Sequence, residues 1–407
     1  MANADGCVEQ AGSQSFSLYF LPVLLVVLVF FSNFMARLIL PPFLVPLEKE
    51  FALTHKQAGG LLLIVSLGIS LSLLLSGVVS TWLTHRRTIV LSSLGVGLSL
   101  HLLPQANSLV ELQAFFFLMG FAVGLYLPSG VSTITSILPL RHWGKGLAMH
   151  EMAPNLSFIL APAVAAAVEG IFAWQEVFAG LGTFSLIMGL GFAVWGRGGD
   201  FTGHAPRPAV IAAILRRPQF WLLALLFGVA VGTTFGIYSM LPLYLVKVHG
   251  LSPSWANNLL SVSRIPCLAM ALGCGYLVDK IGAKPTILGA LIISGGLTTS
   301  IGLLSGSALQ AAVLLQPLCA VCFFPSAFAA ISKIFDYRIR NIAISFIVPV
   351  AVLVGTGLVP SVLGWFGDVG HFSLGFVLWG VSGITGAFLV CFLQITGTDN
   401  DPCGFDT

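Results

Sequence analysis

The sequence predicts an all-α polytopic membrane protein with twelve transmembrane helices in two pseudo-symmetric six-helix bundles. Three observations lead to this fold class: the composition, a regular series of apolar runs, and an internal repeat. Of the 407 residues, 57% are hydrophobic and 8% are charged, whereas a soluble domain carries about 25% charged residues. This composition excludes a soluble enzyme and a disordered chain. The formal net charge of +3 excludes a nucleic-acid partner.

Apolar runs of about 20 residues, enough for a helix to cross a bilayer, alternate with short polar or Gly/Pro-rich segments. The predicted spans are 17–43, 58–82, 88–105, 109–138, 146–168, 174–195, 219–245, 254–278, 285–305, 308–333, 341–364 and 371–395. They divide the chain into a cytoplasmic N-terminal segment 1–16, an N-terminal bundle 17–195, a cytoplasmic linker 196–218, a C-terminal bundle 219–395 and a cytoplasmic tail 396–407. Within the linker, Ala209–Arg217 predicts a short interfacial helix.

The distribution of lysine and arginine predicts the orientation. With the N-terminus inside, the outside segments hold only Lys49, Lys56 and Lys247. The inside segments hold Arg86, Arg87, Arg141, Lys145, Arg197, Arg207, Arg216, Arg217, Lys280, Lys284, Lys333, Arg338 and Arg340. This bias follows the positive-inside rule, so we expect both termini in the cytoplasm. The short loops favour a cell inner (plasma) membrane.

An internal repeat relates the two halves of the chain. Residues 53–58, Leu-Thr-His-Lys-Gln-Ala, resemble residues 251–256, Leu-Ser-Pro-Ser-Trp-Ala, at an offset of 198 residues. Pro128 and Pro325 recur at nearly the same offset. Two like-oriented halves form a parallel repeat, in which a substrate site is expected near the bilayer midplane between the halves.

The loop 275–285 reads GYLVDKIGAKP and resembles the signature loop of the major facilitator superfamily, G-x-L-x-D-[RK]-x-G-x-[RK]. With the helix count and the repeat, the resemblance covers nearly the whole chain. It implies alternating access by a monomer with no cofactor, metal or catalytic residue. The implied conformational latch consists of Gly275, Asp279, Lys280, Gly282 and Lys284, with Arg86 in the first copy of the loop, where Thr81 replaces the acid.

The residue types and the resemblance together indicate the physical role of this loop. Glycine permits a tight turn, and the pseudosymmetry of the family implies that Asp279 faces the positive N-terminus of the fifth helix. Such a contact breaks when the cytoplasmic side opens. We therefore expect the latch to stabilise the outward-open state.

Two arginines lie inside predicted spans, where a charge is costly and marks a functional site by default. The first, Arg37, shares a helix face with Asn33, four residues earlier. This helix resembles that of the anion:cation symporter branch, in which an arginine at this place meets a substrate carboxylate. Ala36 stands where that branch usually has an aspartate. An arginine that caps helix ends or pairs with the outer surface is the structural alternative.

The second, Arg264, lies about 16 Å into the eighth span, with Asn257 and Ser261 on the same face. It resembles the carboxylate-binding arginine of the monocarboxylate and oxalate transporter branches, although Leu260 replaces the aspartate of the former. A guanidinium binds both oxygens of a carboxylate at once, so an anionic substrate is the expected partner. A buried pair with Glu151 is the structural alternative.

Titratable residues begin the fifth predicted helix. Glu151 and Asn155 share one face, and Asn155 is a candidate substrate contact. Glu151 is the only carboxylate well inside a span, and with His150 it is the candidate for proton coupling. A lock residue at the cytoplasmic gate is the alternative for Glu151, and a hydrogen-bonded structural histidine is the alternative for His150.

Aromatic and proline residues mark the helices that line the central cavity in this family. Tyr126 and Tyr238 are expected to contact substrate through ring and hydroxyl, with ordinary packing as the alternative. Pro128 and Pro325 are expected to bend the fourth and tenth helices.

Together these residues predict a secondary active transporter of a small organic anion, a carboxylate, that is either coupled to protons or a uniporter. The first alternative is an efflux antiporter of apolar or cationic compounds, or a metal- or siderophore-type exporter. However, residues 157–166 lack the glycines that drug antiporters carry there. A non-transporting receptor or assembly factor on the same fold is the second alternative. Nitrate carriers pair arginines on the second and eighth helices, and here Ser66 stands opposite Arg264.

Overall fold

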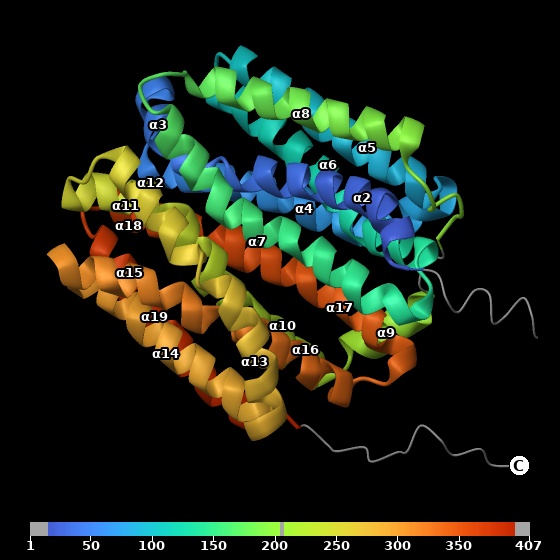
Figure 1. The fold of residues 1–407 in the computed structure, drawn as a ribbon. Helices are drawn as coiled ribbons and strands as arrows, with labels where there is room; N and C mark the ends of the chain where they lie inside the picture. Colours follow the sequence, from blue (N-terminus) through green and yellow to red (C-terminus); the bar gives the residue numbers. More distant parts are fainter. Residues whose placement is uncertain (1–14, 204–206, 395–407) are drawn as a thin grey trace, which may run out of the picture. The chain divides into compact units, whose positions relative to one another are not determined.

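Helices make up nearly all of the regular structure in the computed structural model, which describes residues 15–203 and 207–394 (Figure 1). Within these residues, 11 helices are long and apolar enough to cross a membrane, or up to 12 if the bent pair Pro253–Met270 and Gly273–Ile281 is one span. The polytopic all-helical fold class is therefore confirmed. Residues 1–14 of the expected N-terminal segment and the whole expected tail lie outside the described residues.

The described chain forms two compact units. Unit 1 holds residues 15–38, 71–160 and 170–203, and unit 2 holds residues 39–70, 161–169 and 207–394. Two long helices, α4 (His55–Trp82) and α7 (Trp143–Val168), contribute residues to both units. The beginning of α4 therefore packs with helices from the second half of the sequence.

In unit 1, α5 packs against α6 and α8, and α2 packs against the same two helices (Figure 1). Apart from its parts of α4 and α7, its elements are α2 (Ser17–Leu38), α5 (His85–Leu102), η2 (Leu103–Gln105), α6 (Leu109–Ile137), η3 (Leu140–His142) and α8 (Trp174–Trp195). Its buried core includes Val23, Val26, Phe30, Tyr126 and Phe192. These residues fill the space between α2 and its neighbours, so α2 is held on its apolar side by unit 1.

Unit 2 contains the remaining elements, and its α14 and α19 lie side by side (Figure 1). They are η1 (Pro41–Phe43), α3 (Leu44–Phe51), α9 (Pro208–Leu215), α10 (Pro218–Val231), η4 (Gly232–Gly236), α11 (Ile237–His249), α12 (Pro253–Arg264), α13 (Cys267–Ile281), α14 (Ala283–Leu303), α15 (Gly306–Ala320), α16 (Phe323–Ile334), α17 (Tyr337–Val352), η5 (Leu353–Leu358), α18 (Val359–Asp368), α19 (Phe372–Leu389) and η6 (Val390–Phe392). The short helix expected in the linker corresponds to α9.

The internal repeat is visible in how two helices begin. At α4, the Thr54 side chain accepts a hydrogen bond from the Gln57 backbone N–H at 3.2 Å. At α12, the Ser252 side chain accepts one from the Trp255 backbone N–H at 3.3 Å. A hydroxyl at this position satisfies an amide that the first helical turn leaves without a partner. The repeated sequence thus encodes a repeated helix start.

Two spans are interrupted near their middle. The eighth span ends α12 at Arg264 and resumes as α13 at Cys267, because Pro266 between them lacks a backbone donor. The tenth span breaks between α15 and α16, just before Pro325. By contrast, α6 continues through Pro128 without a break in its helical assignment. The eighth-span break places Arg264 at the end of a helix rather than inside one.

The seventh and eleventh spans each contain a π-helical turn, η4 and η5, and these two turns pack against each other. A Cβ on Gly355 would lie 2.5 Å from the backbone nitrogen of Gly232, and one on Gly236 would lie 2.5 Å from the carbonyl oxygen of Gly355. Only glycine allows backbones to approach so closely. The glycines therefore bring an irregular stretch of the seventh helix into the interior of unit 2.

Candidate functional site

Arg264 is buried inside unit 2, with 7% of its surface exposed. Its Nη2 donates a hydrogen bond of 2.9 Å to the carbonyl oxygen of Thr234, within the π-helical turn η4. Its guanidinium carbon lies 4.8 Å from the centroid of the Tyr238 ring, at a distance typical of a cation–π contact. The seventh span thus supplies both a carbonyl and an aromatic face that hold the guanidinium.

Three described elements of unit 2 near Arg264 carry polar groups but no acidic side chain. The elements α11, α15 and η4, which pack around α12 or around one another, contain no aspartate or glutamate. Among the described residues, the buried Asn257 Oδ1 and Thr234 Oγ1 have no hydrogen-bond partner, and Ser261 is buried on the same helix as Arg264. A buried cation with hydrogen-bonding groups nearby is an arrangement that suits a small anion.

Gln316 stabilises the same region from α15. Its Nε2 donates to the carbonyl oxygen of Thr233 at 2.9 Å and to Thr298 Oγ1 at 3.2 Å. A π-helical turn displaces backbone groups from the regular helical pattern. The carbonyls of consecutive residues in η4 thereby bind side chains from two other helices.

Arg37 lies in unit 1, at the end of α2, and is partly buried. Its guanidinium carbon lies 5.7 Å from the centroid of the Phe34 ring. Asn33, predicted as its neighbour on one face, donates through Nδ2 to Ser92 Oγ at 2.9 Å. The Asn33 amide therefore also joins α2 to α5, a structural contact that sequence periodicity did not reveal.

His150 is fully buried in unit 1 and stacks on Phe30, with ring centroids 4.0 Å apart and planes 8° apart. Neither ring nitrogen has a hydrogen-bond partner among the described residues. The nearest charged group is the Glu151 carboxylate, whose Oε1 lies 3.5 Å from Nδ1. The Glu151 side chain itself is 67% exposed. Because neither ring nitrogen of His150 is hydrogen-bonded to a described residue, the alternative of a hydrogen-bonded structural histidine has no support in this geometry.

The other two predicted contacts of unit 1 are engaged with backbone. Tyr126 is buried and donates through its hydroxyl to the Val26 carbonyl oxygen at 2.8 Å. Asn155 donates to the Glu151 carbonyl oxygen at 2.8 Å. Tyr126 also stacks parallel to His150, with centroids 5.8 Å apart. The Tyr126 ring therefore contacts His150, while the Tyr126 hydroxyl is bound to the backbone of α2.

The predicted latch loop forms the turn between α13 and α14. Gly282 has φ of 90°, a conformation that disfavours other residues. Lys284 donates to the carbonyl oxygens of Cys391 and Leu393 at 3.0 and 3.3 Å. Asp279 and Lys280 are exposed. Lys284 thus binds the end of the last described helix. The acid of the loop, Asp279, does not share this contact and lies exposed.

The first copy of the loop is bound by the linker, a feature the sequence pattern did not reveal. The backbone N–H of Arg86 donates to the Gly199 carbonyl oxygen at 2.9 Å. Its guanidinium donates to the Ala193 carbonyl oxygen at 3.1 Å and lies 3.5 Å from the Asp200 carboxylate. Where Thr81 replaces the expected acid, the linker supplies Asp200.

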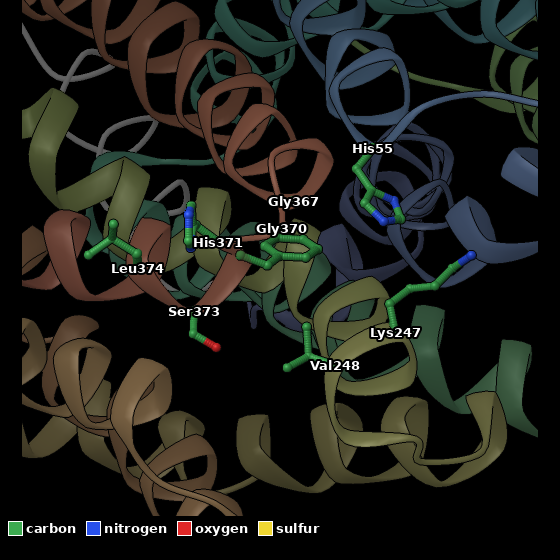
Figure 2. A pocket seen from close by; sticks show the side chains of 9 residues that line it. His55, Lys247, Val248, Gly367, Gly370, His371, Ser373 and Leu374 are labelled. Carbon is green, nitrogen blue, oxygen red and sulfur yellow. The ribbon is translucent and has the colours of Figure 1, made fainter.

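A second polar cluster, also missed from sequence, lies at one end of unit 2 beside a cavity of about 390 Å³ (Figure 2). The cavity is lined by His55, Lys247, Val248, Gly367, Gly370, His371, Phe372, Ser373 and Leu374. Next to it, the buried Glu48 carboxylate contacts His55 Nδ1 at 2.7 Å and Lys247 Nζ at 3.3 Å. The cluster joins residues that lie far apart in the chain, so no local sequence pattern predicts the cluster.

Residues 26–307 match the family model described as Major Facilitator Superfamily. The chain belongs to the major facilitator superfamily. This is a family of transporters rather than enzymes, as the sequence predicted.

Two known proteins resemble parts of the chain in sequence. The probable nitrate/nitrite antiporter NarK1 of Thermus thermophilus is 25% identical over 267 residues, which cover 62% of this chain and 60% of that protein. A multi-drug resistance efflux pump PmrA homolog of Lactococcus lactis subsp. cremoris is 29% identical over 87 residues, 21% of this chain and 73% of that protein. The chain thus aligns with about three fifths of the length of the first relative.

Solved structures share the fold of the chain. A bacterial homologue of the human lysosomal transporter Spinster, in an inward-facing and occupied conformation, matches with a TM-score of 0.79 at 16% identity, over 94% of this chain and 98% of that chain. A D-xylose–proton symporter matches with a TM-score of 0.73 at 18% identity, over 92% and 98%. These similarities confirm the superfamily fold over nearly the whole chain.

Proposed function

We propose that this superfamily member is a secondary active transporter of a small organic anion, with a carboxylate as the group it recognises. The observation that carries the proposal is the buried guanidinium of Arg264 in the eighth span, held against the Thr234 carbonyl oxygen and the Tyr238 ring. A charge inside a membrane span is costly and marks a functional site by default. A substrate carboxylate can bind a guanidinium through two oxygens, and the Tyr238 ring limits how that carboxylate can approach.

Arg37 is proposed as the second anchor, in unit 1. Its position at the end of α2 supports this role, as does the resemblance of this helix to that of the anion:cation symporters. Transport proceeds by alternating access, in which two six-helix bundles, 17–195 and 219–395, rock about a midplane site. Substrate neutralises the buried cations, which favours occlusion of the loaded carrier over the empty one.

Proton coupling is proposed to involve His150 and Glu151. The buried imidazole of His150 has no hydrogen-bond partner among the described residues, and a carboxylate lies 3.5 Å away. Imidazole is the side chain that ordinarily changes charge between pH 5 and 8. A proton taken up there would be bound in the interior of unit 1.

Nitrate is the second candidate substrate, favoured by the similarity to NarK1. It is also an anion that a guanidinium binds through two oxygens. The organic anion is preferred because Ser66, where nitrate carriers would have a second arginine, hydrogen-bonds to Thr356 Oγ1 at 2.7 Å. A hydroxyl, and not a cation, occupies that place in unit 2.

Drug efflux is the third candidate, and its support is the similarity to the PmrA homolog over 87 residues. Two arginines in the spans disfavour cationic compounds because like charges repel in a medium of low dielectric constant. The cation distribution further supports a protein of the cell inner membrane with both termini in the cytoplasm.

The first experiment measures thermal stabilisation of the purified protein by small carboxylates, nitrate, amines and apolar drugs. A ligand at 100 times its Kd adds about 2.7 kcal/mol of stability. We expect stabilisation by a carboxylate, its loss in Arg264→Ala and its reduction in Arg264→Lys, which keeps the charge but not the planar fork. Arg216→Ala, at an exposed arginine, is the matched control. Stabilisation by amines or apolar drugs alone would overturn the proposal, and a response to nitrate alone would promote the second candidate.

A further inference from the structure

The cluster beside the cavity of unit 2 is built around one buried carboxylate. Only 3% of the Glu48 side chain is exposed, and its two oxygens contact His55 Nδ1 and Lys247 Nζ. Figure 2 shows His55 and Lys247 on the same side of the cavity. A buried carboxylate is stable only when positive or hydrogen-bonding partners compensate for its lost hydration. Glu48 thus ties α3 to both α4 and α11.

A second carboxylate binds the start of α4. Asp368, the last residue of α18, accepts hydrogen bonds from the backbone N–H groups of His55 at 2.7 Å and Lys56 at 3.0 Å. These amides lack partners within their own helix, and the helix dipole makes the site favourable for an anion. The end of the eleventh span is therefore fastened to the beginning of the second.

Backbone packing brings these segments close together. A Cβ on Gly364 would lie 2.1 Å from the His55 carbonyl oxygen, and one on Gly59 would lie 2.4 Å from the Pro360 carbonyl oxygen. The His55 ring also stacks on Phe372, with centroids 5.7 Å apart. The start of α4 is therefore packed directly against α18 at this end of unit 2.

Glu48 is the buried charge of the cluster. Its side chain is 3% exposed, whereas that of Lys247 is 42% exposed and Asp368 is exposed to solvent. The other titratable or charged side chains on these elements and beside the cavity are Lys49 and Glu50 of α3, Lys56 of α4, His249 of α11 and His371 before α19. Lys49, Glu50 and Lys56 are exposed to solvent, which screens them. A proton on His55 would place a second positive charge 2.7 Å from the buried carboxylate, in addition to the more exposed Lys247.

We propose that His55 is a proton-binding site which locks this end of unit 2 when it is protonated. The cavity gives solvent access to the ring, and the protonated ring forms a charge-assisted hydrogen bond to Glu48, which is stronger than a neutral one. In the proposed transport cycle, on which this inference rests, the locked end faces outside. Uptake of an external proton would then close the outer gate behind the substrate.

The test measures how fast a thiol reagent reaches Ser66→Cys, a position that is 2% exposed in α4. Labelling is quantified by mass spectrometry at residue 66 and divided by labelling of the exposed native Cys391, which corrects for the effect of pH on thiol reactivity. Between pH 8 and pH 6 we expect the ratio to fall about tenfold, the scale of one added charge-assisted hydrogen bond. In His55→Gln and Glu48→Gln the ratio should stay high at both pH values.

Two matched controls accompany these variants. His371→Gln removes another imidazole that lines the cavity, and Glu50→Gln removes an exposed carboxylate of the same helix as Glu48. Both should keep the fall in labelling. A fall that persists in His55→Gln, that disappears in His371→Gln, or a rise at acidic pH would overturn the proposal. No substrate is needed, so failure here differs from failure of the carboxylate-binding test.

Discussion

A buried imidazole without a hydrogen-bond partner lowers the stability of unit 1. His150 is fully buried, stacks on Phe30, and has no hydrogen-bond partner at either ring nitrogen among the described residues. An unsatisfied buried polar group costs about 1–3 kcal/mol. A protein retains such a cost at sites that bind a ligand or a proton. His150 is therefore expected to limit stability while it serves transport.

His150→Phe should raise the free energy of unfolding by about 1 kcal/mol, because the ring stacking is kept while the unsatisfied nitrogens are removed. The same variant should lose the dependence of uptake on external pH. The measurements are denaturant unfolding and uptake at several pH values. His101→Phe is the control, because its ring contacts the Gly97 carbonyl oxygen at 2.8 Å and Thr183 Oγ1 at 3.2 Å; it should be destabilising. A destabilised His150→Phe would contradict this account.

Among the elements, the helices were predictable and their irregularities were not. Apolar length alone located the span Trp174–Trp195 at its observed bounds, because a bilayer sets how many apolar residues a helix needs. The predicted span 254–278 does not include the break after Arg264, where Pro266 lies. The apolar pattern does not predict η4 or η5, because a π-helical turn is stabilised by contacts with another segment. Here that contact involves Gly355, whose partner Gly232 lies far away in the sequence.

Gly355→Ala should lower the free energy of unfolding by about 1–3 kcal/mol, because overpacking a close contact forces the backbones apart. It should also weaken carboxylate binding, since η4 carries the Thr234 carbonyl that holds Arg264. Gly296→Ala in α14 is the matched control, with nothing within 4 Å of the added Cβ. There, alanine should stabilise the helix by about 0.5–1 kcal/mol. Equal effects of the two substitutions on unfolding would refute the contact argument.

For the whole molecule, the sequence indicated separate parts of a mechanism but not how they are joined. The arginines in the spans and the Gly282 turn were readable from single motifs. The Asp368 contact to His55 joins residues 313 positions apart, and Asp200 meets Arg86 across 114 positions. Such pairs depend on tertiary packing, so no local spacing reports them. The proposed lock around Glu48 was therefore invisible, although Lys247 was recognisable as one of the few cations on the predicted outer side.

The proposed latch and the proposed lock should have opposite effects on one equilibrium. Asp279 stabilises the outward-open state in the proposed cycle, whereas the Glu48–Lys247 contact stabilises the closed outer end. Asp279→Asn should thus slow labelling of Ser66→Cys, and Lys247→Met should accelerate it. Each change should be about fivefold or more, the size of a typical coupling energy of about 1 kcal/mol.

Because the two sites share no described contact, their effects on the free energy should add, and the double variant should label at nearly the rate of the parent protein. Glu111→Gln, at an exposed carboxylate that begins α6, and Lys49→Met, at an exposed lysine of α3, are the matched controls and should label like the parent. If Asp279→Asn instead accelerated labelling, or if the double variant matched one single variant, the latch and the lock would not act on a common equilibrium. Compensation would place both on the single conformational change that carries substrate across the membrane.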